Sequence, residues 1–191
     1  MTARHPVHYS FGEYIAHDAA SSTKHEYLDG QIYAMAGGTP QHSALIASVT
    51  THLSNQVRGS SCRVHSSDLR IRVPETGLAT YPDVAVVCGP WERDPNDAHT
   101  IINPRVLVEV LSPSTETYDR GEKLEHYKRI PTLAAYLLVA HDRRAFELWT
   151  RGPDGAWSST TALAGESVAI STIGAHLDVD AIYDDAGEPD S

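Results

Sequence analysis

Cysteine, lysine and long apolar runs are scarce in this chain of 191 residues. Its two cysteines, Cys62 and Cys88, are 26 positions apart and outside any C-x-x-C pair, so we expect neither a disulfide framework nor a cysteine zinc site. We interpret both as small core residues. No apolar run is long enough to span a membrane, and residues 1–6 lack the apolar core of a signal peptide. We therefore expect a cytoplasmic protein with no membrane partner.

Positive charge is also in short supply, since 15 Lys and Arg face 25 Asp and Glu, for a net charge of -10. This balance argues against a protein that coats nucleic acid through its phosphates. Residues 176–191 hold acidic side chains and no Lys or Arg, so we expect a solvated acidic tail after a single domain over 1–175. The stretches 31–75 and 112–151 have a small basic excess, and any basic surface should come from them.

Hydrophobic periodicity and turn residues predict a succession of helices and strands. Ser10 is placed to cap a helix over 10–20, and the Asp29-Gly30 pair favours a tight hairpin between 25–28 and 31–35. Further helices are predicted over 41–58 and from an Asp119/Glu122 capping box to Pro131. Further strands are predicted at 63–65, 69–73, 81–88, 106–111, 136–140, 145–150 and within 157–170, with a polar, mobile loop over 89–104. This order indicates an α/β or α+β fold with a mixed central sheet.

Two carboxylates interrupt the most apolar strands. Glu109 lies within 106–111, and Asp83 stands where the other central strand begins. A buried carboxylate without a partner costs several kcal/mol, so each of the two needs a cation. If the strands are neighbours, both side chains can bind one hard divalent ion such as Mg²⁺. The alternative is that they pair with arginines such as Arg70 or Arg72.

Lys123 is one of three lysines, and it lies in the first turn of a predicted helix. A cation is unfavourable there because it opposes the positive end of the helix dipole. Two explanations are open: an ion pair with Asp119 four residues earlier, or a lysine directed at a phosphate or at metal-bound water. We interpret Asp119 itself as the helix cap.

Five sequence blocks, taken in order, resemble the Uma-two family of restriction endonucleases. They are KHEYLDG at 24–30, MAGGTPQHS at 35–43, YPDV at 81–84, LVEVLSPST at 107–115 and DRGEKLEHY at 119–127. The resemblance covers roughly residues 10–170. It implies a branch of the PD-(D/E)XK nuclease superfamily, whose restriction-endonuclease-like fold is a mixed central sheet flanked by helices, here preceded by the N-terminal hairpin.

The resemblance also implies the roles of individual residues. Asp83 corresponds to the aspartate of the PD motif and Glu109 to its second acidic residue. The superfamily lysine would stand at position 111, which is Leu111 here. This departure implies that the lysine has moved to Lys123 on the following helix. Glu26 matches an upstream glutamate that can complete the metal site, although it could instead be a surface strand residue facing Lys24 or an arginine.

The implied activity is hydrolysis of phosphodiester bonds in DNA with Mg²⁺ or Mn²⁺, held by Asp83, Glu109, the carbonyl of Val110 and Glu26. Lys123 would position the attacking water or neutralise the scissile phosphate. A homodimer is expected because it could pool two basic patches. RNA or a small phosphodiester is not distinguished from DNA as substrate. The competing reading is a catalytically silent binding or assembly protein that keeps the fold, which the missing lysine at 111 and the acidity would favour.

Two further residues are candidates for secondary roles. Tyr127 lies one turn after Lys123 and either hydrogen-bonds in the site or packs in the core. His42 lies near the start of the 41–58 helix and either meets a phosphate there or is a surface residue of the first turn. No H-x-x-x-H, G-x-S-x-G or G-x-x-x-x-G-K-[ST] motif occurs, so zinc-site, serine-hydrolase and P-loop interpretations have no support.

Overall fold

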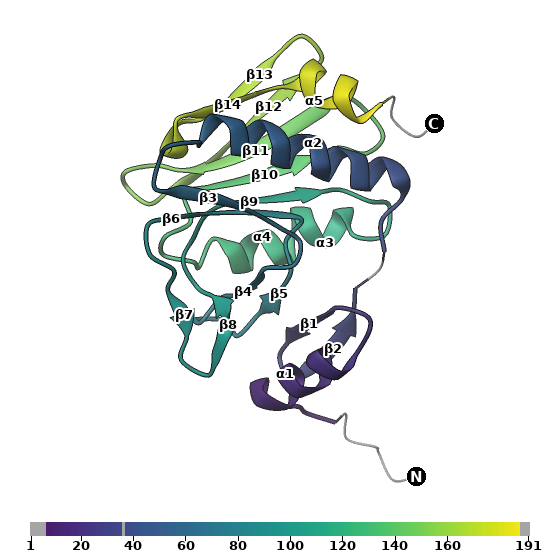
Figure 1. Ribbon diagram of the computed structural model, residues 1–191, viewed down its shortest axis with the longest axis vertical. Coiled ribbons are helices and arrows are strands. Elements are labelled where there is room, and N and C mark those ends of the chain that lie inside the picture. Colours follow the sequence, from purple (N-terminus) through teal and green to yellow (C-terminus); the bar gives the residue numbers. More distant parts are fainter. Residues whose placement is uncertain (1–6, 36, 188–191) are drawn as a thin grey trace.

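The computed structural model describes residues 7–35 and 37–187 (Figure 1). Its central sheet consists, in spatial order, of β12 (Trp157–Leu163), β11 (Ala145–Arg151), β10 (Ala135–Val139), β9 (Pro104–Val110), β6 (Val84–Cys88) and β3 (Cys62–Ser66). A second sheet consists of β2 (Gln31–Ala34), β1 (His25–Leu28), β5 (Ala79–Thr80), β4 (Arg70–Arg72), β8 (Asp97–Ile101) and β7 (Arg93–Asp94). A small separate hairpin pairs β13 (Ser167–Ile170) with β14 (Ala175–Asp178), joined through a 3₁₀ turn at Ser171–Ile173.

The most apolar strands, β6 and β9, lie side by side at the centre of the first sheet. They run antiparallel, with Val84 opposite Val108. The next strand, β10, runs parallel to β9, so the sheet is mixed. The chain returns from β9 to β10 through α3 (Glu116–Arg120) and α4 (Glu122–Tyr127), as a parallel connection requires. The predicted fold class is therefore confirmed.

Helices cover both faces of the central sheet (Figure 1). On one face, α2 (Pro40–Gln56) and α5 (Val179–Ala186) pack with the side chains of Val84, Val86 and Val108. On the other, Leu124 and Tyr127 of α4 pack against the alternate residues of the same strands. Burial on both faces explains why the central strands are apolar without alternation. No helix within the described ranges has the length and apolar character needed to cross a membrane.

The N-terminal segment folds as predicted. Helix α1 (Phe11–Ala20) begins at a capping box in which Ser10 and Glu13 bond reciprocally to each other's backbone. The hairpin of β1 and β2 turns at Asp29 and Gly30, both at positive φ, the conformation for which an Asp-Gly pair is suited. Residue Tyr27 of β1 pairs with β5, which attaches the hairpin to the second sheet.

Two predictions about connecting segments are wrong. The stretch 89–104, expected as a polar and mobile loop, contains β7 and β8, and β8 pairs in parallel with β4. Both strands are short, and several of their side chains are polar and exposed to solvent. The sequence therefore shows little of the hydrophobic alternation that predicts a strand. The single helix expected from Asp119 to Pro131 is broken at Gly121 into α3 and α4. Asp119 is not a cap: it lies within α3 and is buried.

The expectations for the C-terminal end and for the cysteines are also wrong. Residues 176–186 are not a solvated tail, because they form β14 and α5, whose apolar side chains Leu177, Val179, Ile182 and Tyr183 belong to the main core. Acidic residues occupy the outer face of α5, which is why composition alone indicated a tail. Cys62 and Cys88 form a disulfide, because antiparallel pairing of β3 with β6 places them directly opposite each other.

Candidate active site

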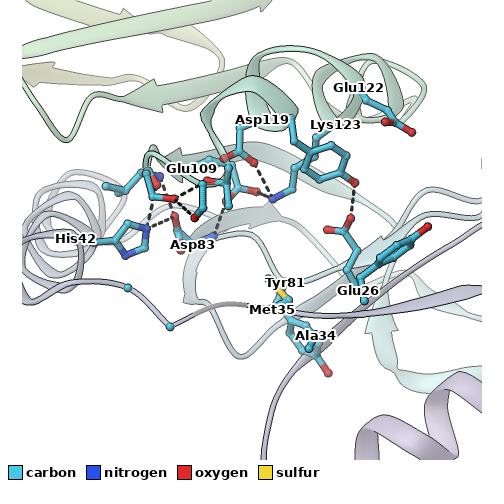
Figure 2. Close-up of a pocket in the computed structure, with 18 of the residues that line it drawn as sticks. Glu26, Ala34, Met35, His42, Tyr81, Asp83, Glu109, Asp119, Glu122 and Lys123 are labelled. Atoms are coloured by element: carbon cyan, nitrogen blue, oxygen red, sulfur yellow. Dashed lines mark hydrogen bonds and ion pairs between the residues drawn. The ribbon is translucent and has the colours of Figure 1, made fainter.

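A cavity of about 560 Å³ lies between the β1-β2 hairpin and the end of the central sheet at which β9 finishes. Its lining comes from β1, β2, the start of α2, the segment before β6, the end of β9, and the α3-α4 region. The lining includes the predicted site residues Glu26, His42, Asp83, Glu109, Val110 and Lys123. Figure 2 shows the side chains of Glu26, His42, Asp83, Glu109 and Lys123 gathered around the cavity from these separate elements.

Asp83 and Glu109 meet because β6 and β9 are antiparallel neighbours. The backbone N–H of Asp83 donates to Glu109 Oε2 over 3.3 Å, and the N–H of Val110 donates to Asp83 Oδ2 over 2.8 Å. Each carboxylate is thus tied to the backbone of the other strand. Arg70 and Arg72 do not pair with them: Arg70 binds Asp18 and Asp97, and Arg72 binds Asp94. The arginine alternative for these two carboxylates is therefore wrong.

Lys123 reaches the same point from α4. Its Nζ lies 2.8 Å from Glu109 Oε1 and 3.1 Å from Asp119 Oδ1. The ion pair with Asp119 is present, as one explanation held, but Lys123 also contacts the central carboxylate. All three side chains are nearly fully buried. Tyr127 donates a hydrogen bond to Glu109 Oε1 over 2.9 Å from within the core, so both interpretations of Tyr127 hold.

The electrostatics of this buried group leave negative charge in excess. Burial raises the pKa of the Glu109 carboxyl to about 8, despite the opposing effect of Lys123. The negative charges of Asp83 and Asp119 act in the same direction as burial. Burial alone would lower the pKa of Lys123, but the surrounding carboxylates raise it, so its ammonium is charged. The same surroundings that favour a proton on Glu109 would favour a bound cation in place of that proton.

Glu26 faces the cavity from β1. Its side chain is buried and accepts a hydrogen bond from the hydroxyl of Tyr118. Lys24, which could have held it at the surface, binds Asp68 instead. Burial, and then the charge of Glu26, raise the pKa of Tyr118, so the phenol is protonated and acts as the donor. Glu26 is therefore a cavity residue held in place from α3.

His42 lies in the first turn of α2, where Thr39 caps the helix. Its Nε2 is 2.9 Å from the carbonyl oxygen of Val110 and 3.4 Å from Asp83 Oδ2. Burial lowers the pKa of His42, but the hydrogen bond and charge of Asp83 outweigh burial and raise it. The imidazole is thus directed into the site and is not a surface residue of the first turn.

Three cavity residues were missed as site residues by sequence reasoning. Asp119 was taken for a helix cap, although its spacing of four from Lys123 was a usable signal. Tyr118 carries no local pattern that separates it from other tyrosines, because it meets Glu26 across 92 positions of sequence. Tyr33 lies in a hairpin that the sequence predicts, but the local pattern does not say that its face of the hairpin lines a cavity.

The donor atoms present suit a hard divalent cation. Asp83, Glu109 and the Val110 carbonyl offer oxygen ligands, the type that Mg²⁺ and Mn²⁺ prefer. Within residues 7–35 and 37–187, no three His, Cys, Asp or Glu side chains are grouped closely enough to hold a metal by themselves. A metal site here would therefore draw on the backbone carbonyl and on water, as Mg²⁺ sites commonly do.

The fold defines the class of the protein. It is similar to the crystal structure of "a putative nuclease belonging to DUF820 from Anabaena variabilis ATCC 29413", with a TM-score of 0.70 over 87% of this chain and 93% of that chain. The sequences are 19% identical. The two chains therefore share the same fold.

The family follows from sequence. Residues 11–180 match the family model Uma2, described as "Putative restriction endonuclease", and the chain belongs to this family. Two proteins of Synechocystis sp. (strain ATCC 27184 / PCC 6803 / Kazusa) are similar over most of its length. "Uncharacterized protein slr1290" is 40% identical over 171 residues, covering 90% of this chain and 89% of the relative. "Uncharacterized protein sll1609" is 28% identical over 158 residues, covering 83% and 89%.

Proposed function

We propose that this protein is an endonuclease that hydrolyses phosphodiester bonds in DNA with Mg²⁺ or Mn²⁺, at a site of the PD-(D/E)XK type. One observation carries the proposal: Asp83, Glu109 and Lys123 converge in one cavity although they come from two strands and a later helix. Burying such a charged group costs desolvation energy, and clefts in which titratable groups perturb one another are often functional sites.

Asp83, Glu109 and the carbonyl of Val110 would hold the metal, and Glu26 would join them directly or through water. When bound, the ion would lower the pKa of water and stabilise negative charge on the phosphate. Lys123 supplies a fixed positive charge beside Glu109, suited to a phosphate oxygen or to the orientation of the attacking water. Asp119 and Tyr127 hold that arrangement by bonding to Lys123 and Glu109.

The proposal includes a homodimer, because a single copy has a net charge of -10 and two copies could combine their basic side chains along one nucleic acid. Sedimentation equilibrium of the purified protein measures this directly. A monomer at all concentrations would remove this part of the proposal and leave the site untouched.

The test is cleavage of supercoiled plasmid and of a single-stranded oligonucleotide with Mg²⁺, Mn²⁺ or EDTA. We expect metal-dependent cleavage that Asp83→Ala and Lys123→Ala each abolish. Loss with Asp83→Ala alone would keep the metal site and discard the role of Lys123. A wild type as inert as Asp83→Ala on every substrate would contradict the proposal and favour a binding protein. If the wild type is inert, calorimetry of Mn²⁺ binding shows whether the protein has a metal site without activity or no metal site.

A further inference from the structure

The cavity has two chemically different walls. One holds Asp83, Glu109, Asp119 and Lys123, from the ends of the central strands and the α3-α4 region. The other, contributed by the β1-β2 hairpin and the residue that follows β2, is lined by Leu28, Tyr33, Ala34 and Met35. Figure 2 shows Ala34 and Met35 across the cavity from Glu109 and Lys123. A site that only held a phosphate and a metal would need no such apolar wall.

Tyr33 is placed in this wall by strand register. It is the cross-strand partner of Glu26, so both side chains emerge on the same face of the hairpin. The opposite face, with Tyr27 and Ile32, packs on α1. Tyr33 is nevertheless 52% exposed, among the few large apolar side chains of the described residues that are open to solvent. Packing among the described residues does not explain why so large an apolar side chain is open to solvent at this position.

The size and charge of the cavity limit what it can enclose. About 560 Å³ is in the range of pockets that enclose a single small-molecule-sized unit. Among the lining residues that the structure describes, Lys123 is the one Lys or Arg. A surface that follows an intact duplex neutralises many phosphates with Lys and Arg. The cavity therefore suits one phosphate and one group attached to it.

We propose that the cavity binds one unpaired nucleotide, with its base stacked on Tyr33 and its phosphate beside Lys123. The substrate is then single-stranded or frayed nucleic acid, and not intact duplex. Tyr33 supplies the flat aromatic face that a base of any sequence can stack on. The proposal rests on the proposed nuclease function for the phosphate end of the nucleotide, and on the hairpin wall for the base.

The experiment compares cleavage of one oligonucleotide as a single strand and as a duplex at fixed salt, using wild type, Tyr33→Ala, Tyr33→Phe and Trp91→Ala. Trp91 is the matched control, an aromatic side chain 50% exposed and outside the cavity lining. We expect the single strand to be preferred. Tyr33→Ala should raise KM for it about 10- to 100-fold with kcat little changed, because stacking acts equally on ground and transition states. Tyr33→Phe and Trp91→Ala should behave like wild type.

A second measurement does not depend on cleavage. A single strand containing 2-aminopurine is titrated with each variant in EDTA, and stacking on Tyr33 should quench its fluorescence in the wild type and in Tyr33→Phe but not in Tyr33→Ala. Equal cleavage of duplex and single strand, or a Tyr33→Ala variant that cleaves and quenches like wild type, overturns the inference and leaves the nuclease intact. Tyr33-dependent quenching by a protein that cleaves nothing supports the nucleotide cavity and contradicts the nuclease. If neither cleavage nor Tyr33-dependent quenching is observed, both the nucleotide cavity and the nuclease are contradicted.

Discussion

At the scale of single residues, the positive charge of the site depends on Lys123. Leu111 lies two positions after Glu109, and its side chain is buried in the apolar cluster with Leu107 and Leu124. An ammonium at position 111 would be surrounded by apolar side chains in that cluster. Lys123 reaches Glu109 from α4 and finds a second carboxylate in Asp119.

We therefore expect Lys123→Met to affect both stability and activity. Removing one partner of a buried ion pair leaves uncompensated charge, so the free energy of unfolding should fall by about 3–5 kcal/mol. Cleavage should fall by about 100-fold or more if the ammonium contacts the phosphate. Urea denaturation and cleavage of the single-stranded oligonucleotide measure the two effects. Lys24→Met is the control, because its partner Asp68 is largely exposed and the loss should be about 1 kcal/mol or less. Equal losses in the two variants would contradict the buried pair.

The sequence was most informative at residues whose type conflicts with their surroundings. A glutamate in an apolar strand and a lysine at the start of a helix are both unfavourable unless an opposite charge lies nearby. Glu109 and Lys123 are that opposite charge for each other. Tyr118 could not be found this way, because it meets Glu26 across 92 positions of sequence and a tyrosine is at home in any core.

At the scale of elements, α1 is attached to the second sheet through a buried acidic side chain. Asp18 accepts hydrogen bonds from Arg70 Nη2 over 2.7 Å and from the Tyr81 hydroxyl over 2.6 Å, and it also binds the backbone of His25. Tyr81 lines the cavity two positions before Asp83. This contact therefore fixes α1 relative to the segment that carries the site carboxylate of Asp83.

Asp18→Asn should lower the free energy of unfolding near neutral pH by about 3 kcal/mol. Burial by itself raises the pKa of Asp18, but hydrogen bonds from Tyr81, Arg70 and His25 lower it below the ordinary value of 3.8. The stabilisation is thus present above about pH 3.8 and is lost as pH falls through the folded-state pKa, so the gap between variant and wild type should narrow in that range. Urea denaturation over a series of pH values measures it. Asp142→Asn, which removes an exposed partner of Arg143, should show no such gap.

The C-terminal helix provides a second test at this scale. Ile182 on α5 is fully buried against the core, so Ile182→Ala should lower the free energy of unfolding by about 2–4 kcal/mol. Chemical denaturation measures the loss. Asp185→Ala removes an exposed side chain of the same helix that pairs with His52, and it should cost about 1 kcal/mol or less. If Ile182→Ala leaves the free energy of unfolding unchanged, residues 176–186 do not contribute to the core and the expectation of a tail was right.

Elements with strong periodicity or strong turn residues were predictable, and weak ones were not. The β1-β2 hairpin and α2 follow from Asp29-Gly30 and from one apolar stripe. The strands β7 and β8 are short and partly exposed, and α5 presents its apolar stripe beneath an acidic face. For the two strands, pairing with distant segments decides the structure. Helix α5 does have a local apolar stripe, which the acidic composition of its other face obscured.

At the scale of the whole molecule, several arginines of the two basic stretches are paired with carboxylates inside the fold. The two stretches with a basic excess were expected to supply a basic surface. In the structure Arg70 and Arg72 are held in buried ion pairs, and Arg120 binds Glu116 and Glu147. Arg144 binds Asp180 and Asp184 of α5. These four arginines thus join elements of the fold together, and they contribute less to a basic surface than the sequence suggested.

This distribution predicts a weak dependence of nucleic-acid binding on salt. For single strands, the logarithm of the binding constant falls with the logarithm of salt concentration with a slope of about -0.7 for each neutralised phosphate. If Lys123 is the main contact, the slope for a single-stranded oligonucleotide should be about -1 or shallower, and Lys123→Met should flatten it. Fluorescence anisotropy across a range of NaCl concentrations measures the slope. Arg129→Ala, which removes an exposed arginine paired with Glu75, should leave it unchanged. A slope of about -5 would mean that a basic track outside the cavity holds the strand, because only several neutralised phosphates produce so steep a dependence.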